Sequence, residues 1–185
     1  MADFSRAEYE ARLEAANRAM HANRLDAILL ASEAEVRYFT GFRTQFWQSP
    51  TRPWFVILRC DQAPLAIIPE IGAELMARSN IAEIEAWPAP RPHDDGLSLL
   101  KTRLENCKRL GVLMGHETTF RMPLNDVFEL RAALRAEWVD ATNIIRNLRM
   151  VKSEREIAYI REICGIAGQG FARVPEIANA GQSLS

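Results

Sequence analysis

The sequence predicts an α/β domain: a mixed sheet of about six strands with helices on both faces. Two observations lead to this fold class. Short apolar runs alternate with amphipathic segments from Ser5 to Thr142, which is typical of a sheet covered by helices. Two β-branched runs are separated only by a short polar turn, which predicts a local antiparallel hairpin and makes the sheet mixed.

The first third of the chain supplies a helix, a buried strand and the hairpin. Apolar residues recur every three to four positions from Tyr9 to Met20, which predicts an amphipathic helix over residues 5–24. The apolar run at residues 26–31 predicts a buried strand. WFVILRC (54–60) and PLAIIP (64–69) flank the polar turn and predict the two strands of the hairpin.

The middle of the chain continues the alternation. Asp94 and Asp95 precede a helix, and we interpret them as an N-terminal cap rather than a catalytic pair, because carboxylates satisfy free backbone N–H groups there. Pro123 stands where the first turn of a later helix tolerates proline. In chain order, the predicted elements are a helix at 72–79, a strand at 81–87, a helix at 97–107, a central strand at 109–115, a helix at 125–135 and a strand at 137–142.

A single long helix is predicted after these elements. Ser153 and Glu156 have the spacing of a capping box, and apolar residues recur at helical spacing from Ile157 to Phe171. No further strand pattern follows this helix. We therefore expect the sequence to be a piece of a longer protein, and we expect a second copy or the preceding domain to cover the apolar stripe.

Composition argues against several classes of partner. An apolar fraction of 48%, a charged fraction of 25% and a formal charge of -1 give no basic excess for nucleic acid. No apolar run reaches the ~18 residues that span a bilayer, and no signal peptide is evident, so we expect a cytoplasmic protein without a membrane partner. Cys60, Cys107 and Cys164 are far apart in sequence, which predicts reduced, mostly buried thiols.

One motif at the start of the long helix resembles a known family. The catalytic domain of the creatinase/prolidase family, the pita-bread enzymes, begins with an Arg-x-x-Lys-Ser-x-x-Glu-Ile pattern. The matching residues here are Arg149, Lys152, Ser153, Glu156 and Ile157.

A second motif supports the same resemblance. VRYFTGF (36–42) is similar to the aromatic-Thr-Gly-aromatic element near the start of the family's amino-terminal domain. The resemblance implies a creatinase-type N-terminal domain, ribonuclease H-like, at residues 1–143. It implies a linker and the first helices of a truncated catalytic domain at residues 144–185.

The resemblance also implies where the chemistry lies. In most of the family, two aspartates, a histidine and two glutamates of the catalytic domain hold two divalent metal ions (Mn, Co or Zn), which activate water for amide hydrolysis. Those ligands would follow Ser185, so we expect this chain alone to hold no metal, cofactor or catalytic residue and to hydrolyse no Xaa-Pro dipeptide. Creatinase works without metal, so the metal dependence of a longer protein stays open.

The segment from Tyr38 to Phe55 carries the candidate substrate-binding residues. In creatinase-like enzymes, the resemblance implies that this loop of one subunit reaches over the active site of the other in a homodimer. The resemblance implies that this loop contributes an aromatic ring and an arginine to the substrate pocket. By position, the matching ring is Trp47, with Phe46 beside it, and the matching arginine is Arg52 or Arg43. An arginine offers a rigid fork of donors to a carboxylate, and rings exclude water from it.

The other residues of this segment have structural interpretations. Phe42, Trp54 and Phe55 are expected in the core or at the sheet edge. Pro50 and Pro53 would restrict the loop backbone and so reduce the entropy lost on closing over a ligand.

Other candidate sites are weaker. His116-Glu117 begins like the zinc motif His-Glu-x-x-His, but Phe120 stands where the second histidine is required. His21 and His93 are interpreted as single surface histidines.

Two functions from different classes remain. The chain could be the substrate-rim and dimerisation domain of a hydrolase for small peptides or amides, an Xaa-Pro dipeptidase or a relative such as creatinase or ectoine hydrolase. It could instead be a non-catalytic binding module that uses its last helix to join a partner. A reading frame that continues beyond Ser185 with the metal-ligand set would favour the hydrolase.

Overall fold

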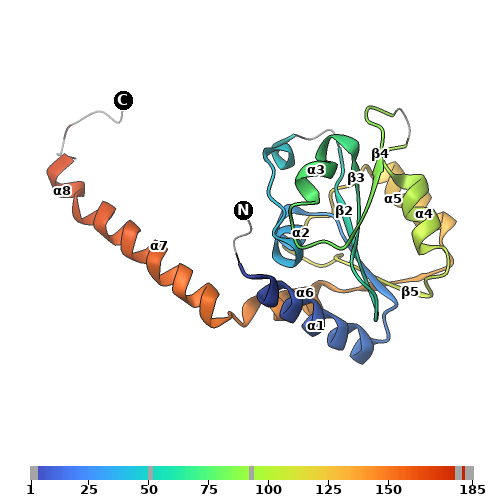
Figure 1. The fold of residues 1–185 in the computed structure, drawn as a ribbon, viewed down its shortest axis with the longest axis horizontal. Helices are drawn as coiled ribbons and strands as arrows, with labels where there is room; N and C mark the ends of the chain where they lie inside the picture. Colours follow the sequence, from blue (N-terminus) through green and yellow to red (C-terminus); the bar gives the residue numbers. More distant parts are fainter. Residues whose placement is uncertain (1–3, 50–51, 92–93, 178–180, 182–185) are drawn as a thin grey trace. The chain divides into compact units, whose positions relative to one another are not determined.

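The computed structural model describes residues 4–49, 52–91, 94–177 and 181. The chain divides into two compact units, Met1–Arg149 and Met150–Ser185. The first unit holds the sheet and the second holds the last two helices, α7 and α8 (Figure 1).

The elements follow the predicted alternation of strands and helices. The strands are β1 (Ala27–Leu30), β2 (Phe55–Arg59), β3 (Leu65–Pro69), β4 (Glu83–Trp87), β5 (Arg109–Val112) and β6 (Glu137–Asp140). The α-helices are α1 (Arg6–Asn23), α2 (Glu33–Thr40), α3 (Ala73–Met76), α4 (Leu97–Leu104), α5 (Leu124–Ala133), α6 (Thr142–Met150), α7 (Glu154–Ala172) and α8 (Val174–Ile177). The short 3-10 helices are η1 (Gln45–Gln48) and η2 (Glu70–Gly72).

The strands form one six-stranded sheet in the order β4-β3-β2-β1-β5-β6. β2 pairs antiparallel with both β1 and β3, and the other neighbours are parallel. β2 and β3 are the predicted hairpin, whose turn contains Asp61 at a positive φ of 58°. β5 lies between β1 and β6, inside the sheet as predicted. The mixed six-stranded sheet is therefore confirmed.

Helices cover both faces of this sheet, which is why its central strands are apolar throughout. Side chains alternate between the two faces of a strand. Ile28 and Leu30 lie in one core cluster with residues of α1, α2 and α6, and Leu29 lies in a second cluster with residues of α4 and α5. Figure 1 shows α2 and α3 on one side of the sheet and α4 and α5 on the other.

One aspartate fixes the pairing of β1 with β5. The Asp26 carboxylate accepts the backbone N–H of Lys108 at 2.7 Å and that of Arg109 at 2.8 Å. The backbone N–H of Asp26 donates to the carbonyl of Arg109 at 3.0 Å. These bonds join segments 82 residues apart in sequence, immediately before Ala27 and Leu110, the first register pair of the two parallel strands.

Two helices of the first unit are not evident from the sequence pattern. α2 contains most of the VRYFTGF motif, whose β-branched and aromatic residues are more typical of a strand. α6 buries Ile145, and Arg149 at its end forms an ion pair with Glu35 at 3.0 Å. The first compact unit ends at Arg149, and the domain boundary at residue 143 stays a sequence-based prediction. The assignment of the following residues to a catalytic domain stays a prediction.

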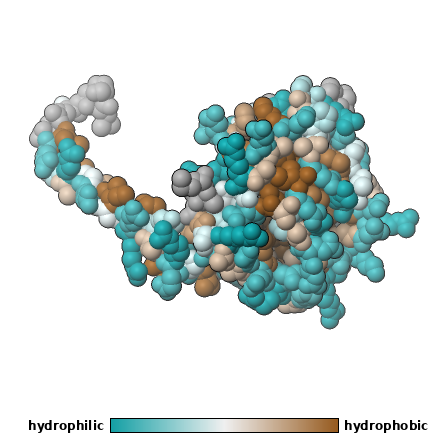
Figure 2. Space-filling view, in the orientation of Figure 1, coloured by the Kyte–Doolittle hydropathy of each residue, from teal (hydrophilic) through white to brown (hydrophobic). Residues whose placement is uncertain are grey.

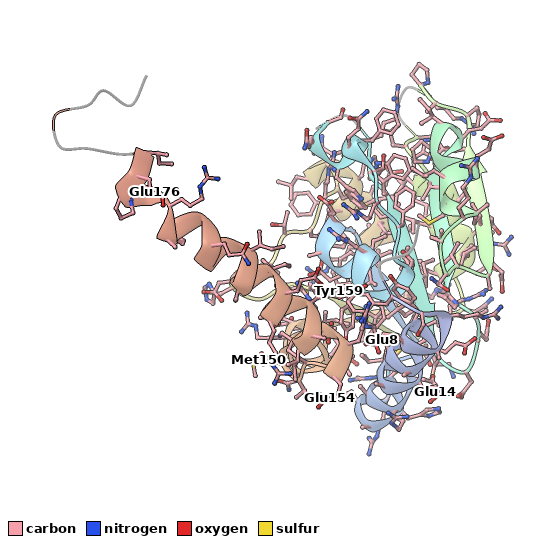
Figure 3. All side chains as sticks on the ribbon, turned by 60° about the vertical axis from the view of Figure 1, so that its left-hand side comes forward. Glu8, Glu14, Met150, Glu154, Tyr159 and Glu176 are labelled. Atoms are coloured by element: carbon pink, nitrogen blue, oxygen red, sulfur yellow. The ribbon has the colours of Figure 1, made fainter. Side chains whose placement is uncertain are left out.

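The second unit begins with the predicted capping box. The Glu156 carboxylate accepts the Ser153 N–H at 2.8 Å, and the Ser153 hydroxyl accepts the Glu156 N–H at 3.2 Å. Figure 3 labels Glu154 and Tyr159 on the helix that follows. Within this unit Phe171 and the thiol-bearing Cys164 are exposed, so the prediction of a covered apolar stripe stays untested. Among the described residues, every helix is too short or too polar to cross a membrane.

We expect Gly41→Ala to lower the stability of the first unit. Gly41 ends α2 at a φ of 73°, and a Cβ there would lie 2.5 Å from the Tyr9 hydroxyl oxygen. The left-handed backbone alone costs an alanine roughly 1–2 kcal/mol, so the Tm measured by calorimetry should fall by more than about 4 °C.

Gly168→Ala is the matched control. Its Cβ would meet no heavy atom of the described chain within 4 Å, and alanine favours the helix interior. The Tm should stay the same or rise. A Gly41→Ala protein with the parent Tm would contradict the strained cap.

Candidate functional site

The Thr-Gly-aromatic element fixes the point where the candidate loop leaves α2. The buried Thr40 hydroxyl donates to the Val36 carbonyl at 2.7 Å and accepts the Phe42 N–H at 3.0 Å. Phe42 is buried and packs on Trp54, with ring centroids 5.4 Å apart. The start of the loop is therefore held by both backbone capping and aromatic packing.

The loop continues as the 3-10 helix η1, which separates the two candidate rings. The Thr44 hydroxyl accepts the N–H of Phe46 at 3.2 Å and caps this turn. The turn directs Trp47 into the core, where it is only 8% exposed, and leaves Phe46 39% exposed. Of these two rings, Phe46 is the one exposed to solvent.

Arg121, which precedes α5, holds η1 from outside the segment. Its Nη1 donates to the Trp47 carbonyl oxygen at 2.8 Å, and its guanidinium carbon lies 5.5 Å from the centroid of the Trp47 ring. Burial lowers the pKa of Arg121, while the charge of Glu33 opposes this shift. Sequence reasoning missed this residue because it lies 74 positions from Trp47 and belongs to no motif.

Phe46 and Arg52 come together at a shallow hollow beside Trp54. The rings of Phe46 and Trp54 are stacked, with centroids 6.3 Å apart and planes at 12°. The hollow is lined by Phe46, Ser49, Arg52, Trp54 and Ile71. Figure 2 shows apolar side chains gathered on the face that carries α3, in keeping with the exposure of Ile71 and Leu75.

The two candidate arginines differ in their surroundings. Arg52 is half-buried in the hollow, whereas Arg43 is exposed and does not line it. Burial raises the pKa of Asp95, and the positive charge of Arg52 opposes that shift. The geometry therefore joins Phe46 with Arg52 at the hollow, while Trp47 is buried against Trp54 and Arg43 does not line the hollow.

The structural interpretations of the neighbouring residues agree with the structure. Phe42, Trp54 and Phe55 are each 2% exposed or less. Pro53 is buried, and Pro50 lies outside the described residues.

The predicted cap at the start of α4 is present in part, because Gly96 is the N-cap residue and Asp94 binds the first turn from two positions before it. The Asp94 carboxylate accepts the Ser98 N–H at 3.0 Å.

Besides His21, the chain has two histidines. His93 lies outside the described residues, and the His116 carbonyl accepts a hydrogen bond from Arg146.

One cluster of potential metal ligands was not evident from the sequence. His21 Nε2 lies 2.9 Å from an Asp61 carboxylate oxygen, and Cys60 is next to Asp61. The prediction that His21 stands alone is wrong, because α1 packs against the turn of the hairpin 40 residues later. In the part of the chain that the structure describes, this is the one group of three or more such ligands. It does not fit a centre of two aspartates, a histidine and two glutamates.

A comparison with known protein families identifies the type of domain that the strand order and the Thr-Gly-aromatic element indicate. The Creatinase/Prolidase N-terminal domain family matches residues 12–151. The chain belongs to this family. The match covers the whole sheet, the candidate loop and α6.

Relatives of this family member are larger proteins. An uncharacterized hydrolase/peptidase, y4tL, of Sinorhizobium fredii is 27% identical over 192 residues, which cover 96% of this chain and 47% of the relative. The Xaa-Pro dipeptidase of Pyrococcus horikoshii is 25% identical over 159 residues, covering 85% of this chain and 40% of the relative. The chain therefore spans about half the length of the curated relatives that it matches.

A solved structure of an isolated domain supports the fold. The structure of the creatinase/prolidase N-terminal domain of an X-Pro dipeptidase from Streptococcus pyogenes aligns with a TM-score of 0.59 at 16% identity. The alignment covers 74% of this chain and 98% of that domain. At this identity the likeness shows the shared fold.

We expect Trp47→Ala to destabilise the first unit far more than Phe46→Ala. Removing a buried tryptophan ring costs about 3–5 kcal/mol, whereas Phe46 keeps much of its surface in water. Urea unfolding followed by circular dichroism measures both changes. Trp47→Phe should recover part of the loss. Equal stabilities for the two alanine variants would contradict the assignment of Trp47 to the core.

Proposed function

We propose that this chain is the substrate-rim and dimerisation domain of a creatinase/prolidase-family hydrolase that acts as an Xaa-Pro dipeptidase. The observation that carries this proposal is the family match over residues 12–151, together with relatives named Xaa-Pro dipeptidase. The hydrolytic chemistry belongs to a longer protein in this proposal. Two divalent metal ions held outside this chain would supply the activated water there.

The hollow at the candidate loop suits one end of a dipeptide. The Arg52 guanidinium offers paired donors for the carboxylate of a C-terminal proline. The exposed face of Phe46 offers an apolar surface for the pyrrolidine ring. Trp47 acts beneath them as support, because it is buried and held by Arg121.

The proposed dimer would carry this rim to the active site of the partner subunit. Apolar side chains are exposed on the same side of the unit as the hollow: Phe46, Ile71 and Leu75. Covering them against a second subunit would remove apolar surface from water, which favours association by roughly 25 cal/mol per Å².

The test uses the full reading frame that contains this chain, assayed with Mn²⁺ or Co²⁺ on Xaa-Pro dipeptides. Phe46→Ala and Arg52→Ala should each lower kcat/KM at least about tenfold, on the order of 1.4 kcal/mol, while the Tm changes by less than about 2 °C. Arg52→Lys should recover only part of the activity, because lysine lacks the fork of donors.

Two controls separate the parts of the proposal. Arg18→Ala removes an exposed arginine of α1 that does not line the hollow, and it should leave kcat/KM unchanged. Arg43→Ala decides between the two candidate arginines. Turnover of creatine or ectoine in place of dipeptides would overturn the substrate class. Normal turnover by both Phe46→Ala and Arg52→Ala would overturn the rim role.

A further inference from the structure

The C-terminal end of α1 and the turn of the β2–β3 hairpin bring three different ligand types together. His21 comes from α1, and Cys60 and Asp61 come from the turn. His21 Nε2 lies 2.9 Å from Asp61 Oδ1, and Cys60 Sγ lies 3.9 Å from Asp61 Oδ2. One ligand atom from each residue falls within 4.8 Å of the others.

Asn17 fixes the orientation of the aspartate. Its side-chain amide donates to Asp61 Oδ1 at 2.9 Å, and its amide oxygen accepts the backbone N–H of Asp61 at 2.9 Å. Asp61 adopts the left-handed backbone with a φ of 58°, a conformation that aspartate and asparagine tolerate better than most residues. This arrangement resembles the outer hydrogen bonds that orient carboxylates around metal ions.

The cluster does not have the properties of a nucleophilic cysteine site. The His21 ring interacts with Asp61, so it is not placed to take the thiol proton. Metal binding is the chemistry that uses all three donors together.

We propose that His21, Cys60 and Asp61 bind one zinc ion at the junction of α1 and the hairpin. An imidazole, a thiolate and a carboxylate are all ligands of Zn²⁺, and the thiolate disfavours Mg²⁺ and Ca²⁺. Bond lengths of about 2.0–2.3 Å place tetrahedral ligand atoms roughly 3.3–3.8 Å apart. The observed separations of 2.9 Å and 3.9 Å lie just below and just above that range.

Solvent exposure leaves the fourth position open to water. The side chains of His21 and Asp61 are 57% and 64% exposed, so an ion can enter from solvent. Asp61 and Asn17 also line a groove of about 600 Å³ whose apolar wall includes Leu13, Met20 and Leu58. Figure 3 labels Glu14 of α1, another residue of this groove. A bound ion would link α1 to the hairpin beside it.

The experiment titrates the untagged, dialysed 185-residue chain with ZnCl₂ by isothermal calorimetry. We expect about one Zn²⁺ per chain, a rise in Tm with zinc, and a sulfur-to-metal charge-transfer band when Co²⁺ replaces Zn²⁺. His21→Gln, Cys60→Ser and Asp61→Asn should each weaken zinc binding at least tenfold. Cys60→Ser should also abolish the charge-transfer band.

Matched controls use the same residue types outside the cluster. His116→Gln, Cys164→Ser and Asp126→Asn should bind zinc like the parent chain. Circular dichroism without metal checks that each variant is folded, and asparagine at position 61 is compatible with the left-handed turn. The proposal is overturned if the parent chain binds no zinc, or if the cluster variants bind it as tightly as the controls do.

Discussion

The packing around Trp54 is the interaction on which the candidate loop depends. The ring centroid of Trp54 lies 5.4 Å from that of Phe42, 6.3 Å from that of Phe46 and 6.1 Å from that of Trp47. A Cβ at Gly72 would lie 2.1 Å from the same ring, so η2 can pass this close only because it carries no side chain there. Trp54 precedes β2 directly, and the loop is thereby attached to the sheet.

This attachment holds residues 42–49 of the loop in place without a ligand. The Thr40 hydroxyl holds the loop at one end, Trp54 lies beneath it, and Arg121 binds the Trp47 carbonyl from another segment. A loop that is already ordered loses less conformational entropy on binding. The exposed face of Phe46 and the half-buried charge of Arg52 are presented on this rigid base.

The sequence predicts the sheet well because each central strand is covered on both faces and is apolar throughout. It fails for α2, whose Val-Arg-Tyr-Phe-Thr run has strand-like residues, because tertiary packing of Val36 and Phe39 overrides local preference. It also ranks Trp47 above Phe46, since adjacent rings look alike until the 3-10 turn decides which one is buried. The contacts of His21 with Asp61 and of Arg121 with Trp47 are long-range, so no local pattern reveals them.

The Asp26 carboxylate has a consequence for the order in which the chain folds. The carboxylate accepts hydrogen bonds from the backbone of residues 82 and 83 positions later in the chain. The hairpin, β4 and α4 all lie between them in sequence. Closing so long a loop costs entropy that is recovered only when β5 is in register with β1. Contacts of such sequence separation are associated with slow folding. The hairpin of β2 and β3 joins neighbouring segments and can form early, whereas the other half of the sheet must wait for this distant pairing.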